Sequence, residues 1–256
     1  MSRDFSLQKY EELCEAIIGS GYHTSSVRDF ILSEKPNNKT IIVRHDVDRC
    51  PTDALNMAHI ESNLGISATY YFRTTPNVFK PNIIKAISEM GHEIGYHYET
   101  LAQTGGDYGK AIKLFEASLE KFRNLAAIDT ISMHGRPFSK WDSRCLWDKF
   151  SFKNYGILAE AYLSIDYRKV SYLCDTGRSW DSQRFNIRDK VSHASPLKLK
   201  TTNDLMKAIS SNKLDQACIS CHPNRWPKDI SGWMVSWLAD WCTNIAKLII
   251  SRWHSK

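Results

Sequence analysis

The chain alternates between short apolar runs and longer segments in which apolar residues recur every three or four positions. Residues 7–18 carry apolar side chains at positions 7, 10, 13, 17 and 18, a helical spacing that ends near Gly19. The β-branched run at residues 40–43 predicts a buried strand instead, and this strand leads into the polar residues 44–48. Both patterns then repeat along the chain.

Strand and helix patterns alternate over most of the sequence. Helices are expected over residues 51–64, 81–90 and 107–122, each opened or closed by Pro, Gly or Asp. Further strands are predicted at residues 68–72, 93–98, 129–133, 156–161, 170–174, 194–199 and 217–221. Such alternation indicates βα units and a parallel sheet. We therefore expect an α/β fold in a single domain, residues 1–256: a distorted (β/α) barrel of about seven parallel strands with an added N-terminal helix.

The last helical segment differs from the others in its aromatic content. Residues 230–253 carry Trp233, Trp237 and Trp241 at four-residue spacing. One interpretation is a C-terminal helix that packs this stripe on the barrel. The other is a helix that contacts a membrane surface or a partner, with Lys247 and Arg252 nearby.

Composition narrows the functional classes. The net charge of +6 is spread over scattered Lys and Arg residues without a run of five, so no nucleic-acid role is expected. A charged glycan, a nucleotide-linked sugar or a membrane surface fits a mildly basic protein, as does a merely solvated basic surface. The chain has no secretion signal pattern and an odd count of seven cysteines, which favours a cytoplasmic protein with reduced thiols. The CxxCH pattern at residues 218–222 is therefore interpreted as a strand end, not a haem site.

Candidate chemistry lies where the predicted strands end. Asp46 and Asp48 flank Val47, so an extended backbone would place both carboxylates on one face. One could bind a cation while the other accepts a proton from water, although Asp48 could also cap the helix at Pro51.

Histidines occupy the corresponding positions of other strands. His97 and Glu99 close the strand at residues 93–98, while His134 and His222 each follow a later strand. A barrel brings such strand ends together, so we expect a metal site with catalytic groups beside it.

Five stretches resemble the polysaccharide deacetylases (the NodB-homology or carbohydrate esterase family 4 superfamily), and more narrowly the HDVD subgroup from bacterial surface-polysaccharide loci. They span about residues 40–225 and are residues 44–48 (RHDVD), 91–97 (GHEIGYH), 134–137 (HGRP), 175–180 (DTGRSW) and 221–223 (CHP). The resemblance implies a divalent cation, expected to be zinc, and removal of an N-acetyl or similar acyl group from a sugar. It also implies Asp46 as general base, Asp48 and His97 as metal ligands and His222 as general acid, with Arg136 in the motif that positions the base.

Two departures from the family pattern change the expected ligand set. Val47 separates aspartates that are adjacent in the family, and Leu101 stands where a second metal-binding His is usual. We expect His134 to replace that ligand, because an imidazole at an adjacent strand end preserves the ligand type; Glu99 and Asp175 are the alternatives. Leu101 also favours a different class of function, a barrel that binds a glycan or supports an assembly without catalysis.

The remaining expectations concern the substrate. Arg136 and Arg178 could hold Asp46 or an anionic part of the substrate. Trp180 and Trp226 offer flat surfaces for a sugar ring, or else belong to the core. The same residues could also serve hydrolysis of a formyl group or another acyl amide. A cytoplasmic location favours a saccharide intermediate of biosynthesis over a finished polymer.

Overall fold

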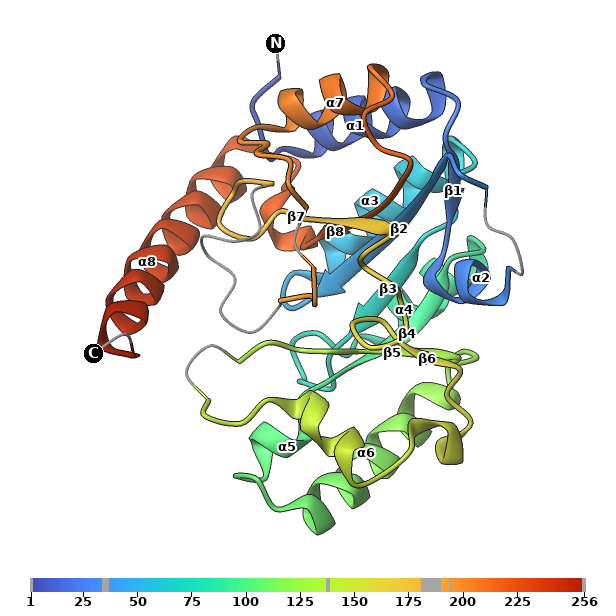
Figure 1. Ribbon diagram of the computed structural model, residues 1–256, viewed down its shortest axis with the longest axis vertical. Helices are drawn as coiled ribbons and strands as arrows, with labels where there is room; N and C mark the ends of the chain where they lie inside the picture. Colours follow the sequence, from blue (N-terminus) through green and yellow to red (C-terminus); the bar gives the residue numbers. More distant parts are fainter. Residues whose placement is uncertain (1, 34–36, 137–138, 181–189, 194, 255–256) are drawn as a thin grey trace.

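A curled sheet of parallel strands forms the centre of the molecule (Figure 1). The computed structural model describes residues 2–33, 37–136, 139–180, 190–193 and 195–254, with side chains up to residue 246. The strand order is β6-β5-β4-β3-β2-β8-β7, with β1 beside β2, and every pairing in the described ranges is parallel. The strands are β1 His23–Ser25, β2 Thr40–Val47, β3 Thr69–Phe72, β4 Glu93–Tyr98, β5 Thr130–Met133, β6 Ala159–Glu160, β7 Val170–Cys174 and β8 Gln216–Cys221.

Helices surround this sheet. In Figure 1, α1 and α7 lie side by side at one end, α5 and α6 lie at the other, and α8 runs along one side. The helices are α1 Leu7–Gly19, α2 Val27–Leu32, α3 Pro51–Asn63, α4 Pro81–Glu89, α5 Thr100–Gln103, α6 Tyr108–Arg123, α7 Thr202–Ser210 and α8 Ile230–His254. The predicted fold class is confirmed: the chain is an α/β protein whose parallel strands form a distorted half-barrel, with a helix added at each end.

The central strand β2 shows how the sequence produces two different environments. All eight of its residues are buried, and alternate side chains point to opposite faces. Arg44 and Asp46 point to one face, where Arg44 reaches Ser132 of β5. His45 points to the other, where its Nε2 lies 2.7 Å from the Glu61 carboxylate of α3. The two faces of β2 therefore carry different buried polar groups, an arginine and an aspartate on one and a histidine bonded to a glutamate on the other.

One predicted strand is wrong, and several elements were not predicted. Residues 195–199 form no strand, and residue 194 lies outside the described ranges. Pro196 lies in this stretch and cannot donate a backbone hydrogen bond to a neighbouring strand. The three-residue β1 and the six-residue α2 were not predicted, because they carry too few periods for a pattern to show, and the nine-residue α7 was not predicted either.

Trp180 and Trp226 lie in the core, whereas two tryptophans of α8 are exposed. Trp180 and Trp226 are fully buried and pack with Phe5 in the core, so neither is available to a sugar ring. Trp237 and Trp241 of α8 are instead 45% and 53% exposed. The interpretation that α8 packs this stripe on the barrel is therefore wrong for these two side chains. Among the described helices, none has the length and apolar character needed to cross a membrane.

Candidate active site

At six of the strands, the residue that directly follows the strand belongs to the candidate site. Because all strands are parallel, their carboxyl ends lie at one edge, and the side chains that follow them converge there. These residues are Asp48 after β2, Arg73 after β3, Glu99 after β4, His134 after β5, Asp175 after β7 and His222 after β8. The sequence singled out all of them except Arg73.

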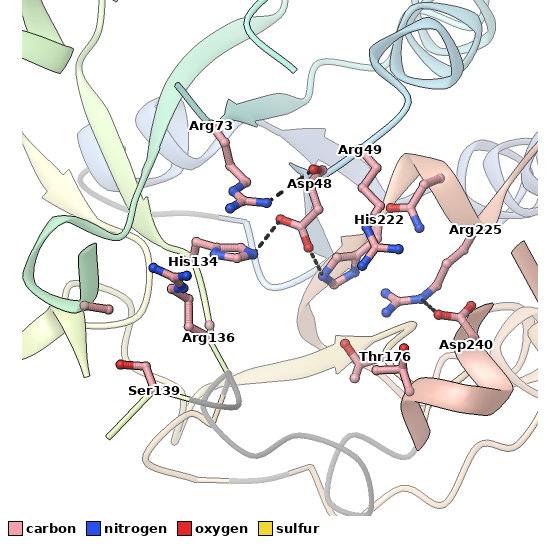
Figure 2. A pocket seen from close by; sticks show the side chains of 14 residues that line it. Asp48, Arg49, Arg73, His134, Arg136, Ser139, Thr176, His222, Arg225 and Asp240 are labelled. Atoms are coloured by element: carbon pink, nitrogen blue, oxygen red, sulfur yellow. Dashed lines mark hydrogen bonds and ion pairs between the residues drawn. The ribbon is translucent and has the colours of Figure 1, made fainter. Parts of the chain in front are cut away.

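A cavity of about 530 Å³ opens at this edge (Figure 2). In Figure 2, Asp48 lies between His134 and His222, with arginines around them. The lining is mostly polar and contains no Phe, Tyr or Trp of the described chain: Asp48, Arg49, Arg73, Ala102, His134, Gly135, Arg136, Ser139, Thr176, His222, Asn224, Arg225, Asp240 and Thr243. Its volume lies in the range of ordinary small-molecule sites.

Two imidazoles face one oxygen of Asp48. The Nε2 atom of His97 lies 3.4 Å from Asp48 Oδ1, and the Nε2 atom of His134 lies 3.3 Å from the same oxygen. This oxygen is buried and accepts no hydrogen bond of good geometry from the described residues. A buried carboxylate oxygen without such a bond is costly, which makes Asp48, His97 and His134 a candidate cation site. Their ligand atoms are more widely spaced than those of Cys174, Asp175 and His222, which all lie within 4.8 Å of one another.

Hydrogen bonds at the other ring nitrogen, Nδ1, fix the tautomer and orientation of both imidazoles. His97 Nδ1 lies 2.9 Å from the Ser132 carbonyl oxygen, and His134 Nδ1 lies 3.0 Å from Glu99 Oε2. Both partners can only accept, so each Nδ1 carries the proton and donates it. In the neutral form of each ring, the Nε2 lone pair would then be directed at Asp48, the arrangement usual for metal-binding histidines.

Protonation competes with a cation at this place. Burial alone would lower the pKa of His134, but Asp48 and Glu99 outweigh it and raise that pKa to about 9. Burial likewise raises the pKa of the Asp48 carboxyl, yet His134 and His97 hold it well below its ordinary value. A proton on His134 and a cation beside Asp48 therefore satisfy the same negative charge, and binding of a cation would release the proton.

Neither Leu101 nor Glu99 is placed to act as the third metal ligand in place of His134. Leu101 is fully buried in the core and offers no donor atom. Glu99 lies behind His134, where it also accepts from Arg73 Nη2 at 2.6 Å. Burial would raise the pKa of Glu99, but His134 and Arg73 lower it to about 2. Glu99 therefore orients His134 as a carboxylate.

Asp46 lies deeper than Asp48 and forms a two-point ion pair with Arg44. Arg44 Nε donates to Asp46 Oδ1 at 2.9 Å and Arg44 Nη2 donates to Oδ2 at 2.7 Å. Burial would raise the pKa of Asp46, but Arg44 and the nearby histidines together outweigh it and keep that pKa below its ordinary value. Asp46 Oδ2 is 4.0 Å from His97 Nε2, so the carboxylate borders the same centre.

The arginines expected at Asp46 have other partners. Arg136 is 45% exposed, and its Nε lies 3.5 Å from Glu99 Oε2. Arg178 donates to Asp240 and Ser236 of α8. The expectation that either would hold Asp46 is corrected by Arg44, which lies two residues before Asp46 on the same face of β2 and reaches it directly.

His222 belongs to a second buried cluster beside Asp48. Its Nδ1 lies 2.6 Å from Asp175 Oδ1, and its Nε2 lies 3.9 Å from Asp48 Oδ2. Burial and Arg225 lower the pKa of His222, but Asp175 and Cys174 are among the groups that together raise it well above the ordinary value. A protonated His222 therefore faces the cavity and can donate a proton there.

The same cluster includes a group that could hold a metal ion. The ligand atoms of Cys174, Asp175 and His222 all lie within 4.8 Å of one another and are buried. Asp175, however, already accepts from the His222 ring and backbone, from Arg225 and from Trp226. Four donors occupy its two oxygens, which favours a carboxylate that holds His222 over a metal ligand.

Comparisons with known proteins add no assignment: no family model matches the chain, and neither do characterised proteins or solved structures. The functional case therefore depends on the chemistry of the site.

Proposed function

We propose that the protein is a metal-dependent hydrolase that removes an N-acetyl or similar acyl group from a sugar in bacterial surface-polysaccharide biosynthesis. One observation carries this proposal: Asp48 Oδ1 lies between two imidazoles whose Nδ1 protons are already engaged. One carboxylate and two imidazoles match the donor set of catalytic zinc sites.

Asp48, His97 and His134 would hold the cation, and zinc suits these ligands best. When bound, a divalent cation supplies a Lewis acid beside the amide carbonyl. Glu99 and the Ser132 carbonyl keep the two imidazoles in the ligating tautomer.

Asp46 and His222 carry out the two proton transfers. Asp46, kept ionised by Arg44, accepts a proton from the attacking water as the new C–O bond forms. His222, held by Asp175, donates its proton to the amine nitrogen as the C–N bond breaks. One water is consumed, and the products are a carboxylic acid and a free amine. The bond is a carbon–nitrogen bond of an acylated sugar, not a peptide bond.

The substrate class is supported by two features. The order of the five motif stretches resembles that of polysaccharide deacetylases. The cavity is also polar and open at its mouth, as a site for a hydrated saccharide requires.

A second candidate function is a barrel that binds a glycan without turnover. Leu101, buried in the core where the family pattern has a metal-binding His, favours it. A protonated His134 between Asp48 and Glu99 would then be a stable ion-pair cluster needing no metal.

Elemental analysis of the purified protein tests the proposal and separates the two candidates. We expect about one divalent ion per chain, loss of this ion in Asp48→Asn, and its retention in Asp166→Asn, which alters an exposed aspartate. The wild type should then release acetate from at least one member of a panel of N-acetylated sugars. A wild type that stays metal-free after incubation with zinc, manganese, nickel or cobalt supports the binding-only barrel.

A further inference from the structure

The cavity contains more positive than negative charge in its wall. Four arginines line it, Arg49, Arg73, Arg136 and Arg225, against the two carboxylates of Asp48 and Asp240. The described lining therefore carries more arginines than carboxylates. A neutral sugar does not require such a surplus.

Two of these arginines already have partners. Arg73 donates to Glu99 at 2.6 Å. Arg225 donates to Asp175 at 2.8 Å and to Asp240 at 3.3 Å. Their positive charges are therefore balanced by carboxylates at or behind the wall.

Arg49 and Arg136 differ from this pair. Within the described ranges no carboxylate lies within 4.0 Å of Arg49, which is exposed at the cavity. The nearest carboxylate oxygen of Arg136, Glu99 Oε2 at 3.5 Å, is already bound by His134. These two guanidinium groups have donors available for a ligand.

We propose, on the basis of the function proposed above, that the acylated sugar carries a phosphate or diphosphate group and that Arg49 and Arg136 bind it. A phosphate monoester carries close to two negative charges at neutral pH, which the two guanidinium groups of Arg49 and Arg136 can balance. The planar guanidinium binds phosphate oxygens in pairs. The described lining has no Phe, Tyr or Trp on which a sugar could stack, so hydrogen bonds and charge are the available means of recognition.

Calorimetric titration tests this with N-acetylglucosamine 1-phosphate, neutral N-acetylglucosamine and glucuronate as probes. We expect the phosphate probe to bind at least ~10-fold more tightly than either other probe, since charged hydrogen bonds contribute about 1.5–3 kcal/mol. Arg49→Gln and Arg136→Gln should each weaken the phosphate probe ~10-fold and leave the neutral sugar unchanged. Arg168→Gln, at an exposed arginine paired with Asp166, is the control and should change neither.

Phosphate also binds divalent metals, so the titrations are repeated on chelator-treated protein, where the dependence on Arg49 and Arg136 must persist. Equal affinity for the phosphate and neutral probes, or equal affinity for glucuronate, would overturn the phosphate assignment. The readout is independent of metal content and acetate release, so failure here is distinguishable from failure of the proposed hydrolase.

Helix α8 provides an independent observation, because its polar side faces the body of the protein. Asp240 accepts from Arg178 and Arg225, and Ser236 donates to the Asn224 carbonyl. The opposite side is apolar and exposed: Val235 70%, Met234 60%, Leu238 53%, Trp241 53%, Trp237 45% and Ile245 39%. A contiguous apolar face of this kind marks an interaction surface.

The charges around this face indicate its partner. Between residues 230 and 246 the one charged residue is Asp240, which is buried, so the exposed face carries no charge. Charged residues flank it: Arg3, Lys228 and the acidic Asp229 are exposed near its start, and the basic residues Lys247, Arg252 and Lys256 follow in the sequence. We propose that α8 lies on a bilayer surface with anionic headgroups, with Trp237 and Trp241 in the interfacial region. Asp240 and Thr243 of the same helix line the cavity, so its mouth would lie beside that surface.

Vesicle flotation tests this with phosphatidylcholine alone and with phosphatidylcholine containing phosphatidylglycerol. We expect binding to the anionic vesicles and a loss of at least ~10-fold in Trp237→Ser/Trp241→Ser. Leu163→Ser, at a residue 51% exposed outside α8, is the control and should not change binding. Wild type that fails to float, or that forms a dimer dissociated by the double variant without binding vesicles, would overturn the proposal.

Discussion

Arg44 and Asp46, two residues apart on one face of β2, form a buried ion pair in which two guanidinium nitrogens each donate to a different carboxylate oxygen. Both side chains are at most 3% exposed. This pair keeps the proposed base ionised and fixes its orientation, because the fork of Arg44 permits one arrangement of the carboxylate.

Asp46→Asn should abolish acetate release, because an amide cannot accept the proton of water at neutral pH. Metal content should stay at the wild-type level, since Asp46 is not among the three proposed ligands. Unfolding in urea should show a loss of about 3 kcal/mol, as Arg44 is left with an uncompensated buried charge. Asp166→Asn removes the same charge from the exposed Asp166–Arg168 pair, also two residues apart. This control should leave acetate release, metal content and stability unchanged. Retained turnover in Asp46→Asn would refute its role as base.

Glu99→Gln should weaken metal binding by ~10-fold or more while the ligands themselves remain. The amide is a weaker acceptor for His134 Nδ1 and leaves Arg73 unbalanced, so the imidazole is held less firmly. Competition with a chromogenic chelator measures the affinity. Glu120→Gln, which changes a largely exposed glutamate paired with Arg123, is the matched control. Equal affinities of Glu99→Gln and wild type would show that Glu99 does not support the metal site.

The placement of the strand-end residues could be anticipated from the sequence. A polar residue after a buried run lies at one edge of a parallel sheet whatever the details of packing, so Asp48, His134 and His222 converge by topology alone. Arg73 has the same position after β3 and could have been identified by the same rule. Arg44 could have been found from the period of two along β2.

The partners of side chains could not be anticipated in this way. Periodicity predicts that α8 is a helix, but both its faces could pack on the barrel. The buried bonds of Asp240 with Arg178 and Arg225, which come from distant parts of the chain, decide the orientation. The burial of Trp226 depends likewise on the Asp175 carboxylate that accepts from its ring.

Gly95→Ala should destabilise the fold by about 1–3 kcal/mol. A Cβ at this position of β4 would lie 2.3 Å from ring atoms of Tyr71, whose hydroxyl bonds Thr130 and whose ring lies beside Arg44. The ring is fully buried and has no free space into which to move. Gly19→Ala, at the end of α1 with nothing within 4 Å, should be neutral or slightly stabilising. Thermal unfolding of both variants checks the contrast, and equal melting temperatures would contradict the close packing of Tyr71 under β4.

Asp175 should contribute acid-dependent stability. Burial would raise the pKa of its carboxyl, but Arg225 and His222 outweigh burial and lower that pKa to about 2 from an ordinary value of 3.8. Because the folded-state pKa is depressed, the contribution is complete above pH ~4 and is lost as the pH falls toward ~2. The difference corresponds to about 2 kcal/mol. Urea unfolding of wild type and Asp175→Asn should therefore show a stability gap that narrows from pH 5 down to the lowest pH at which both fold. In the wild type His222 is protonated throughout this range, because its pKa is raised well above the ordinary value. A gap that stays constant with pH would mean that the Asp175 carboxylate does not depend on Arg225 and His222 for its charge.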